Sequence, residues 1–499
     1  MTSTLRGQQS QSALASALAW LDAPAAADAL HDLSPLRHHL RAVAEAPMDP
    51  RKRLMLLGPF QKRTDNASRA LKPRLREAML PLPSRLRLIA QGLIEIHARL
   101  ATTTLDAIAN LTATQRVAAG RRLAEFCLTA VNNLAEQQLV ALMVALAPPA
   151  DLWQHAQRAY TLLKLCPSEQ AATAERVFKA MLALAAAQPE TFLGQEIGFL
   201  VEYLRCAPSG VTVTGQPDAA LDAWYWLDTE RPQPPVAVAR RPPPADGKLL
   251  YFSCAALAQI AHGHLRRLGA GETPEALGLP RSLASDECRF VLHRAQTRWA
   301  LPPRRRHHHR PSNYPVEICP ELDQLWDLLR DTDRTDAGQD SLSLSKWTVM
   351  NESPGGFAML HLSGALSGLA SGGALGLRIS PDRPWNVCVV RWARSNDADQ
   401  VEVGLELVAP AAAPVHIVGG KGAGGGKLTP ALLLRTGEGQ HRNEALLTYR
   451  NGVVGHPFTM IAEPNGRVQL TECQVRRPAL QTGSVEILEF LRDFSPSWN

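Results

Sequence analysis

Apolar residues recur with a helical period from residue 11 to about residue 210. In the segment 84–100, for example, apolar residues recur at a spacing that forms one stripe on a helix, and Ser84 stands where a capping residue belongs. The stretches 115–147 and 152–166 have the same pattern, and Pro167 ends the second. Helices rich in Ala and Leu with short breaks predict a bundle or a stack of helical hairpins. The stripe in the first segment is formed by Leu86, Ile89, Leu93, Ile96 and Leu100.

The segment 232–244 has six prolines in 13 residues and is the clearest boundary in the sequence. Beyond it the pattern predicts a short strand over 248–252 and helices over 255–268 and 284–300. A further helix, over 320–330, would carry its apolar residues on one face.

From Lys346 the apolar period changes from helical to the alternation of strands. Asn451-Gly452 and Asn465-Gly466 are strong signals for hairpin turns. The sequence therefore predicts an α+β multidomain protein, in which an N-terminal all-helical region precedes an antiparallel β-barrel and a C-terminal β-rich unit. The expected domains are a helical region, a Pro-rich linker with a helical connector, the barrel and the C-terminal unit, over 1–230, 231–302, 303–410 and 411–499.

Composition narrows the class of protein. A chain of 499 residues with 45% apolar and 20% charged residues predicts several folded domains. The eight cysteines are scattered, which favours a reducing compartment over a disulfide framework. The longest apolar stretch, 139–147, is too short for a membrane span, so we expect a cytoplasmic protein without membrane insertion.

Positive charge is concentrated in one part of the chain. The net charge is only +6, but residues 289–316 contain seven arginines and no acidic residue. The run Arg304–Arg310 lies about 40 residues before the segment Asn351–Gly356. Guanidinium groups bind phosphate oxygens in bidentate fashion, and the amide, hydroxyl and glycines of the second segment suit a polar ligand that approaches the backbone closely.

These two motifs together resemble the PilZ domain family of bacterial receptors for the second messenger cyclic di-GMP. The family pattern is an Arg-x-x-x-Arg pair, here Arg306 and Arg310, followed by Asn-x-Ser-x-x-Gly, here within Asn351–Gly356. Three later segments, 366–379, 385–392 and 401–407, resemble the strands that follow in the family. The resemblance covers about residues 303–410. Two departures are the helical insert at 320–330 and Asn351 in place of the commoner Asp.

The resemblance implies a ligand site and no catalytic residue, metal or cofactor. The arginines would clamp the phosphates, Asn351 would accept from guanine N1 and N2, and the glycines would let the ligand approach. An Arg fork also matches guanine O6 and N7. The implied ligand-binding residues are Arg305, Arg306, Arg310, Asn351, Ser353, Gly355 and Gly356.

Other interpretations of the same residues remain open. Arg304–Arg310 could be a solvated basic linker, and Asn351–Gly356 an ordinary turn between strands. His307–His309 could bind a metal, although the flanking arginines would repel a cation. The glycine-rich segment 419–427 does not fit the phosphate-loop pattern, because Lys421 and Leu428 stand where Gly and Ser or Thr are required. The tryptophans at 326, 347, 385 and 392 are expected mainly in the core, although one of the four could stack on a base.

Three functional hypotheses follow. The first is a cyclic di-GMP effector that senses the ligand with its barrel and contacts an unidentified protein through its helical region. The second is a ligand-free interaction scaffold with a degenerate barrel. The third is a nucleic-acid binder using Arg289–Arg310, which the small net charge disfavours. The sequence leaves open the process controlled, the partner, the oligomeric state and the function of residues 411–499.

Overall fold

The fold is described from a computed structural model. The chain divides into two compact units, one formed by residues 1–78, 82–189 and 194–305 and the other by residues 79–81, 190–193 and 306–499. We call these the helical unit and the barrel unit, and each is described by itself. Side chains are not described at residues 2–11, 121, 221, 436 and 443. The structure describes residues 2–492 except 25, 77, 79, 166, 208, 218–220, 303, 305–307, 331–343, 365, 367, 368, 396–399, 420–427, 437–442, 451–456 and 464–466.

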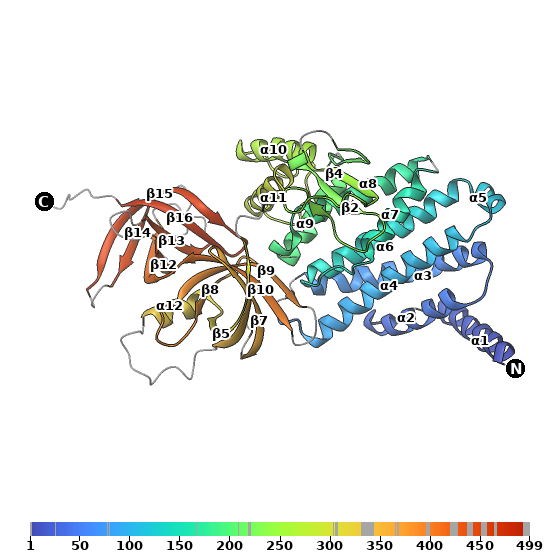
Figure 1. The fold of residues 1–499 in the computed structure, drawn as a ribbon, viewed down its shortest axis with the longest axis horizontal. Coiled ribbons are helices and arrows are strands. Elements are labelled where there is room, and N and C mark those ends of the chain that lie inside the picture. The colour runs from blue at the N-terminus through green and yellow to red at the C-terminus, as the bar shows by residue number, and fades with distance from the viewer. Residues whose placement is uncertain are drawn as a thin grey trace. The chain divides into compact units, whose positions relative to one another are not determined.

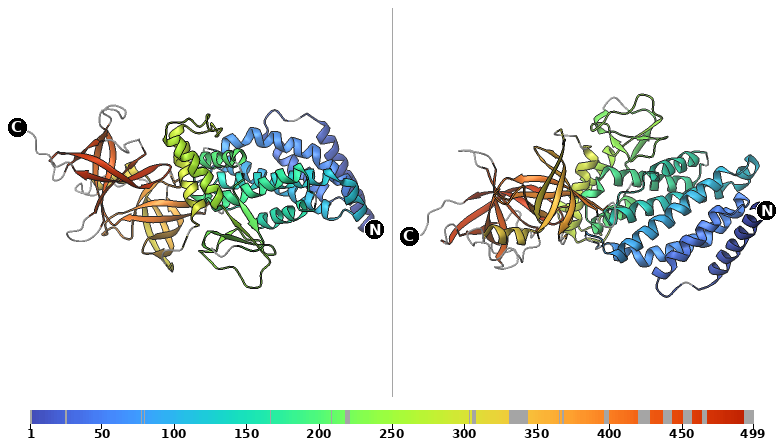
Figure 2. Two further views of the ribbon diagram at one scale, coloured as in Figure 1. Left: turned by 90° about the horizontal axis from the view of Figure 1, so that it is seen from above. Right: turned by 60° about the horizontal axis from the view of Figure 1, so that its bottom comes forward.

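Long helices make up most of the helical unit (Figure 1). Several of them, such as α3, α4 and α6, run side by side, as the two views of Figure 2 also show. None of the described helices has a stretch long and apolar enough to cross a membrane. The helices are α1 (Thr2–Asp22), α2 (Leu30–Glu45), α3 (Pro50–Leu71), α4 (Ser84–Ala109), α5 (Ala113–Ala119), α6 (Arg121–Met143), α7 (Leu152–Leu163), α8 (Glu169–Ala186), α9 (Gly194–Cys206), α10 (Ala255–Gly269) and α11 (Ser285–Ala300).

Helix α4 illustrates how the sequence pattern becomes packing. Ile89, Leu93, Ile96 and Leu100 are all fully or almost fully buried, as their spacing predicts. Ser84 is the first residue of the helix and not its cap, because the non-helical residue before the helix is Pro83.

A small antiparallel sheet completes the helical unit, with strand order β1-β4-β2-β3. The expected strand near 248–252 is β4, and the helices predicted over 255–268 and 284–300 are α10 and α11. The proline-rich segment contributes the short strand β3. The division of the chain into four domains stays a prediction. The strands of this sheet are β1 (Thr212–Thr214), β2 (Tyr225–Asp228), β3 (Val236–Ala237) and β4 (Leu249–Ser253).

The barrel unit contains two closed antiparallel barrels of six strands each (Figure 1). This confirms the predicted α+β class and the predicted barrel, and it identifies the C-terminal β-rich unit as a second barrel. The strand orders are β10-β7-β6-β5-β8-β9 in the first barrel and β11-β12-β13-β16-β15-β14 in the second. The strands are β5 (Arg310–Cys319), β6 (Ser345–Ser353), β7 (Gly356–Gly364), β8 (Ala374–Arg378), β9 (Asn386–Ser395), β10 (Val401–Ala409), β11 (Ala412–Gly419), β12 (Leu428–Thr436), β13 (Asn443–Tyr449), β14 (Pro457–Ala462), β15 (Gln469–Gln481) and β16 (Val485–Arg492).

The two barrels share a hydrophobic core, which we call the inter-barrel core. At its centre lies the predicted insert helix α12 (Leu322–Arg330), whose Trp326 donates from Nε1 to Val415 O at 2.8 Å. Strands β9 and β12 are therefore buried on both faces. One face of each strand lines the interior of its own barrel, and the opposite face packs in the inter-barrel core. The members of the inter-barrel core include Leu322, Leu325, Trp326, Trp385, Val387, Val389, Leu432, Leu434, Leu447, Val485 and Ile487.

Candidate functional site

The pairing of β5 with β6 brings the basic segment to the Asn-x-Ser-x-x-Gly segment. Arg310 is the first residue of β5 and stands opposite Glu352, and Pro311 stands opposite Asn351. The first barrel thus brings together five of the predicted site residues, Arg310, Asn351, Ser353, Gly355 and Gly356. The other two, Arg305 and Arg306, lie outside the described residues.

The sequence pattern gave no indication that Arg310 begins a strand. Pro311 and Pro315 both lie in β5, and proline cannot donate to a strand ladder. The structure accommodates them with an irregularity in the β5–β6 register between Pro311 and Tyr314. The consequence is that Arg310 has its backbone fixed in the sheet, with its side chain exposed to solvent.

Arg310 is available to bind an anion. It makes no ion pair within the part of the chain that the structure describes, whereas Arg304 pairs with Asp222. The nearest acidic residue in the register, Glu352, accepts a hydrogen bond from the hydroxyl of Tyr314 at 2.7 Å. Burial raises the pKa of Tyr314, and the hydrogen bond to Glu352 raises it further. Tyr314 therefore stays protonated and keeps donating to this carboxylate.

The side-chain oxygen of Asn351 already has a partner. His309 Nδ1 donates to Asn351 Oδ1 at 3.0 Å. This is the oxygen that the sequence analysis assigns to guanine N1 and N2, so a ligand would have to replace the imidazole. His309 was considered in the sequence only as a metal ligand. Its contact with Asn351 depends on the β5–β6 pairing, which the sequence did not reveal.

The turn from β6 to β7 explains the two glycines in structural terms. Ser353 Oγ donates to Gly356 O at 3.4 Å, and Leu407 N donates to Gly355 O at 3.0 Å. A Cβ atom on Gly356 would lie 1.9 Å from the backbone oxygen of Leu405. Gly356 is therefore required for β7 to pair with β10 and close the barrel, whatever else it does.

One row of side chains extends the site across the outer face of the barrel. Residues directly opposite one another in an antiparallel sheet lie on the same face. Asn351 pairs with Ala358, Ala358 with Gly404, and Gly404 with Trp392. The row belongs to the outer face, because the neighbouring pair of Met359 and Val403 is buried inside. Asn351 and an indole thus lie on one surface, separated only by small residues.

Trp392 leans over this surface. A Cβ atom on Gly404 would lie 2.0 Å from Trp392 Nε1, so the glycine makes room for the ring. The guanidinium carbon of Arg394 lies 4.9 Å from the centre of a Trp392 ring. Trp392 is half-buried, unlike Trp326, Trp347 and Trp385, which are buried as expected. The assignment of Trp392 to the core was wrong, because β9 presents it on the outer face.

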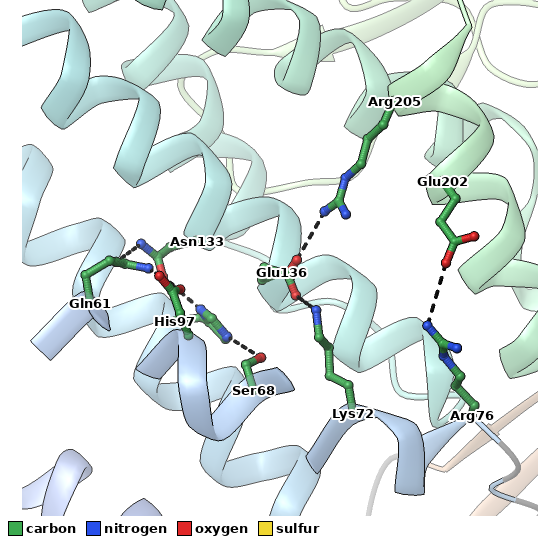
Figure 3. A network of polar contacts seen from close by, with 10 residues as sticks. Gln61, Ser68, Lys72, Arg76, His97, Asn133, Glu136, Glu202 and Arg205 are labelled. Atoms are coloured by element: carbon green, nitrogen blue, oxygen red, sulfur yellow. Dashed lines mark hydrogen bonds and ion pairs between the residues drawn. The ribbon is translucent and has the colours of Figure 1, made fainter. Parts of the chain in front are cut away.

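A second concentration of polar side chains lies inside the helical unit (Figure 3). His97, which is 1% exposed, contacts Ser68 Oγ at 3.2 Å and Asn133 Oδ1 at 2.8 Å. Burial lowers the pKa of His97 below its ordinary value of 6.5. Glu136 binds Lys72 Nζ at 2.5 Å and Arg205 Nη2 at 3.1 Å. These contacts join α4 to α6 and α6 to α9, and they stabilise the helical packing. No group of three His, Cys, Asp or Glu side chains in the described ranges is placed to hold a metal ion.

Comparison with known proteins finds family models that match two stretches of the chain. Residues 15–218 match the family model of the N-terminal domain of the cyclic-di-GMP receptor FimW, and residues 230–414 match that of its middle PilZ domain. A curated relative, the cyclic-di-GMP receptor FimW of Pseudomonas aeruginosa, is 27% identical over 153 residues. That alignment covers 28% of this chain and 23% of the relative, which is less than a quarter of its length. The predicted resemblance to PilZ domains is confirmed.

Proposed function

Because the chain belongs to the family of FimW-like cyclic-di-GMP receptors, we propose that it binds cyclic di-GMP on the first barrel. The observation that carries this proposal is the convergence of Arg310, Asn351 and the Ser353–Gly356 turn at one corner of the barrel. Arg305 and Arg306, from the segment just before β5, would complete the cation set.

Each part of this corner suits one part of the ligand. The guanidinium of Arg310, which forms no ion pair with any residue that the structure describes, would bind a phosphate, since charge-assisted bidentate contacts with phosphate are strong. Asn351 Oδ1 would accept from guanine N1 and N2 after replacing His309. Trp392, whose half-buried ring lies over Gly404, would give a base an aromatic surface to stack on.

The proposal describes a receptor without catalytic activity. The family model that matches the first barrel is named for a receptor, which favours sensing over chemistry. The helical unit would contact a protein partner and pass on the state of the barrel. Since cyclic di-GMP is an intracellular second messenger, the proposal places the protein in the cytoplasm.

A ligand-free scaffold is the rival function, and one observation favours it. In this structure His309 occupies the acceptor oxygen of Asn351, and the carboxylate of Glu352 lies beside it in the sequence. A barrel with this arrangement could have lost its ligand and kept only its surfaces for protein contact.

Calorimetric titration with cyclic di-GMP separates the two functions. We expect the full chain to bind, and Arg306→Ala or Arg310→Ala to weaken binding about tenfold to a hundredfold, because a hydrogen bond to a charged group contributes about 1.5–3 kcal/mol. Arg304→Ala is the matched control, since Arg304 is paired with Asp222 in the helical unit. Absence of heat and of a thermal shift with the wild type would establish the scaffold. Unchanged affinity in both site variants would refute the site.

A further inference from the structure

The helical unit contains a cavity that the cyclic di-GMP site does not use. It has a volume of about 260 Å³ and is lined by α6, α8, α9, the segment after α9 and α10. All of these elements belong to the helical unit. We call this cavity the α8–α9 pocket. Ligand pockets commonly measure about 300–1,000 Å³, so this one suits a bulky side chain better than a large cofactor.

The walls of the α8–α9 pocket are apolar. Helix α8 contributes Val177, Ala180, Met181 and Leu184, which recur at helical spacing and so form one continuous stripe. Met181 and Leu184 are buried, whereas Val177 and Ala180 are only half-buried. The stripe therefore runs from the core of the unit into the pocket, where it has room for another apolar group.

The charged residues around these walls are all cationic. Arg176, Lys179 and Arg205 line the pocket, and no Asp or Glu does so. Lys179 is paired with Glu175, and Arg205 shares Glu136 with Lys72. Arg176 is different, because its one described contact is with the hydroxyl of Thr173 at 3.2 Å. Its charge is therefore not compensated by any described carboxylate, and the pocket should attract an anionic group.

A buried amide on α6 supplies an independent observation. Gln138 lines the pocket and is 2% exposed. Its Nε2 donates to Met181 O at 3.2 Å, while its Oε1 has no hydrogen-bond partner among the residues that the structure describes. Leaving a buried carbonyl oxygen unpaired is unfavourable. A ligand N–H group that reached this enclosed oxygen would remove that cost.

We propose that the α8–α9 pocket binds a peptide segment of a partner protein, in which a bulky apolar residue is flanked by Asp or Glu. The apolar residue would extend the stripe on α8, a carboxylate would pair with Arg176, and a backbone N–H could reach Gln138. An amphipathic helix laid in an apolar groove is a common mode of such recognition. The proposal names the surface and the partner chemistry for the protein contact inferred above, and it rests on that part of the proposed function.

Fluorescence anisotropy with labelled peptides tests the proposal on the full chain. The probe is a short helical peptide with Leu and Phe at i, i+4 and i+7 and Glu at the other positions. One control peptide has Lys in place of every Glu, and another has Ser in place of the apolar residues. We expect saturable binding of the acidic peptide and binding at least about tenfold weaker of both controls. No binding of the acidic peptide, or equal binding of the Lys peptide, would overturn the proposal.

Variants locate the binding to the pocket. Arg176→Glu should weaken binding of the acidic peptide about tenfold or more, because an attraction becomes a repulsion. Arg122→Glu makes the same change at an exposed position of α6, about 24 Å along the helix from Gln138, and should have no effect. Ala180→Trp should fill the pocket and abolish binding. Should that variant fail to fold, Arg176→Glu still decides, since Arg176 is exposed; unchanged affinity there rejects the pocket.

The same samples are titrated with cyclic di-GMP. Peptide binding that Arg176→Glu weakens supports the α8–α9 pocket whether or not the nucleotide binds. If the nucleotide binds and the peptide does not, the proposal that the α8–α9 pocket binds a peptide is refuted, and the proposed receptor function is retained.

Discussion

Trp392 offers the sharpest test of the surface on the first barrel. It lies in the same row as Asn351 and its ring covers Gly404. Stacking of a base on an aromatic side chain contributes about 1–3 kcal/mol, so Trp392→Ala should weaken cyclic di-GMP binding about 5- to 150-fold. The ring is only half-buried, and the loss of stability should therefore be smaller than the roughly 3–5 kcal/mol of a core Trp→Ala change.

Two companion variants distinguish the ring from its position. Trp392→Phe keeps an aromatic surface and should lose much less affinity than Trp392→Ala. Gly404→Ala keeps the indole but places a methyl group 2.0 Å from Nε1, so the ring must move. We expect weaker binding and some loss of stability, because three atoms of the rigid indole ring must move together. Calorimetry gives the dissociation constants and thermal unfolding checks the fold. A dissociation constant for Trp392→Ala within about twofold of wild type, with the fold intact, would refute the stacking surface.

Two further predictions concern histidines. His309→Ala should tighten cyclic di-GMP binding about 2- to 12-fold, because the ligand no longer has to break the hydrogen bond from His309 to Asn351, which contributes about 0.5–1.5 kcal/mol. The control is His308→Ala, at an exposed position, which should leave the affinity unchanged. Equal effects of the two changes in calorimetry would contradict this. The folded state should lose stability as the pH falls below about 6.5, by at most about 1.4 kcal/mol per pH unit, because the unfolded chain then takes up a proton that buried His97 resists. His97→Gln should flatten this dependence in denaturant unfolding at several pH values, and an unchanged slope would show that another group is responsible.

Much of the fold could be predicted, because the spacing of apolar residues along the chain indicates which segments form helices and which form strands. The stripe on α4, the insert helix α12 and the strands after residue 345 all follow from the spacing of apolar residues. Strand β5 could not be predicted, since Pro311 and Pro315 are poor strand residues and only the pairing with β6 holds them. The closure of the C-terminal strands into a second barrel also depends on distant pairing, such as β13 with β16.

The candidate site was predictable in residue type but not in contacts. The motif singled out Arg310, Asn351 and the turn glycines as candidates, because their order along the chain is distinctive. It could not identify His309 as the partner of Asn351 or Trp392 as a surface residue, since both depend on strand register. The motif also could not show why a glycine stands at position 356. A ligand that approaches the backbone would favour glycine there, and the backbone of β10 leaves no room for a side chain.

The inter-barrel core has a practical consequence for any experiment on the first barrel alone. Ending the protein after β10 would remove Leu432, Leu434, Val485 and Ile487, which cover the outer side of β9 and α12. The shortened chain would expose a sheet face rich in valine and tryptophan, and such a face promotes aggregation. A fragment made to test cyclic di-GMP binding should therefore include both barrels.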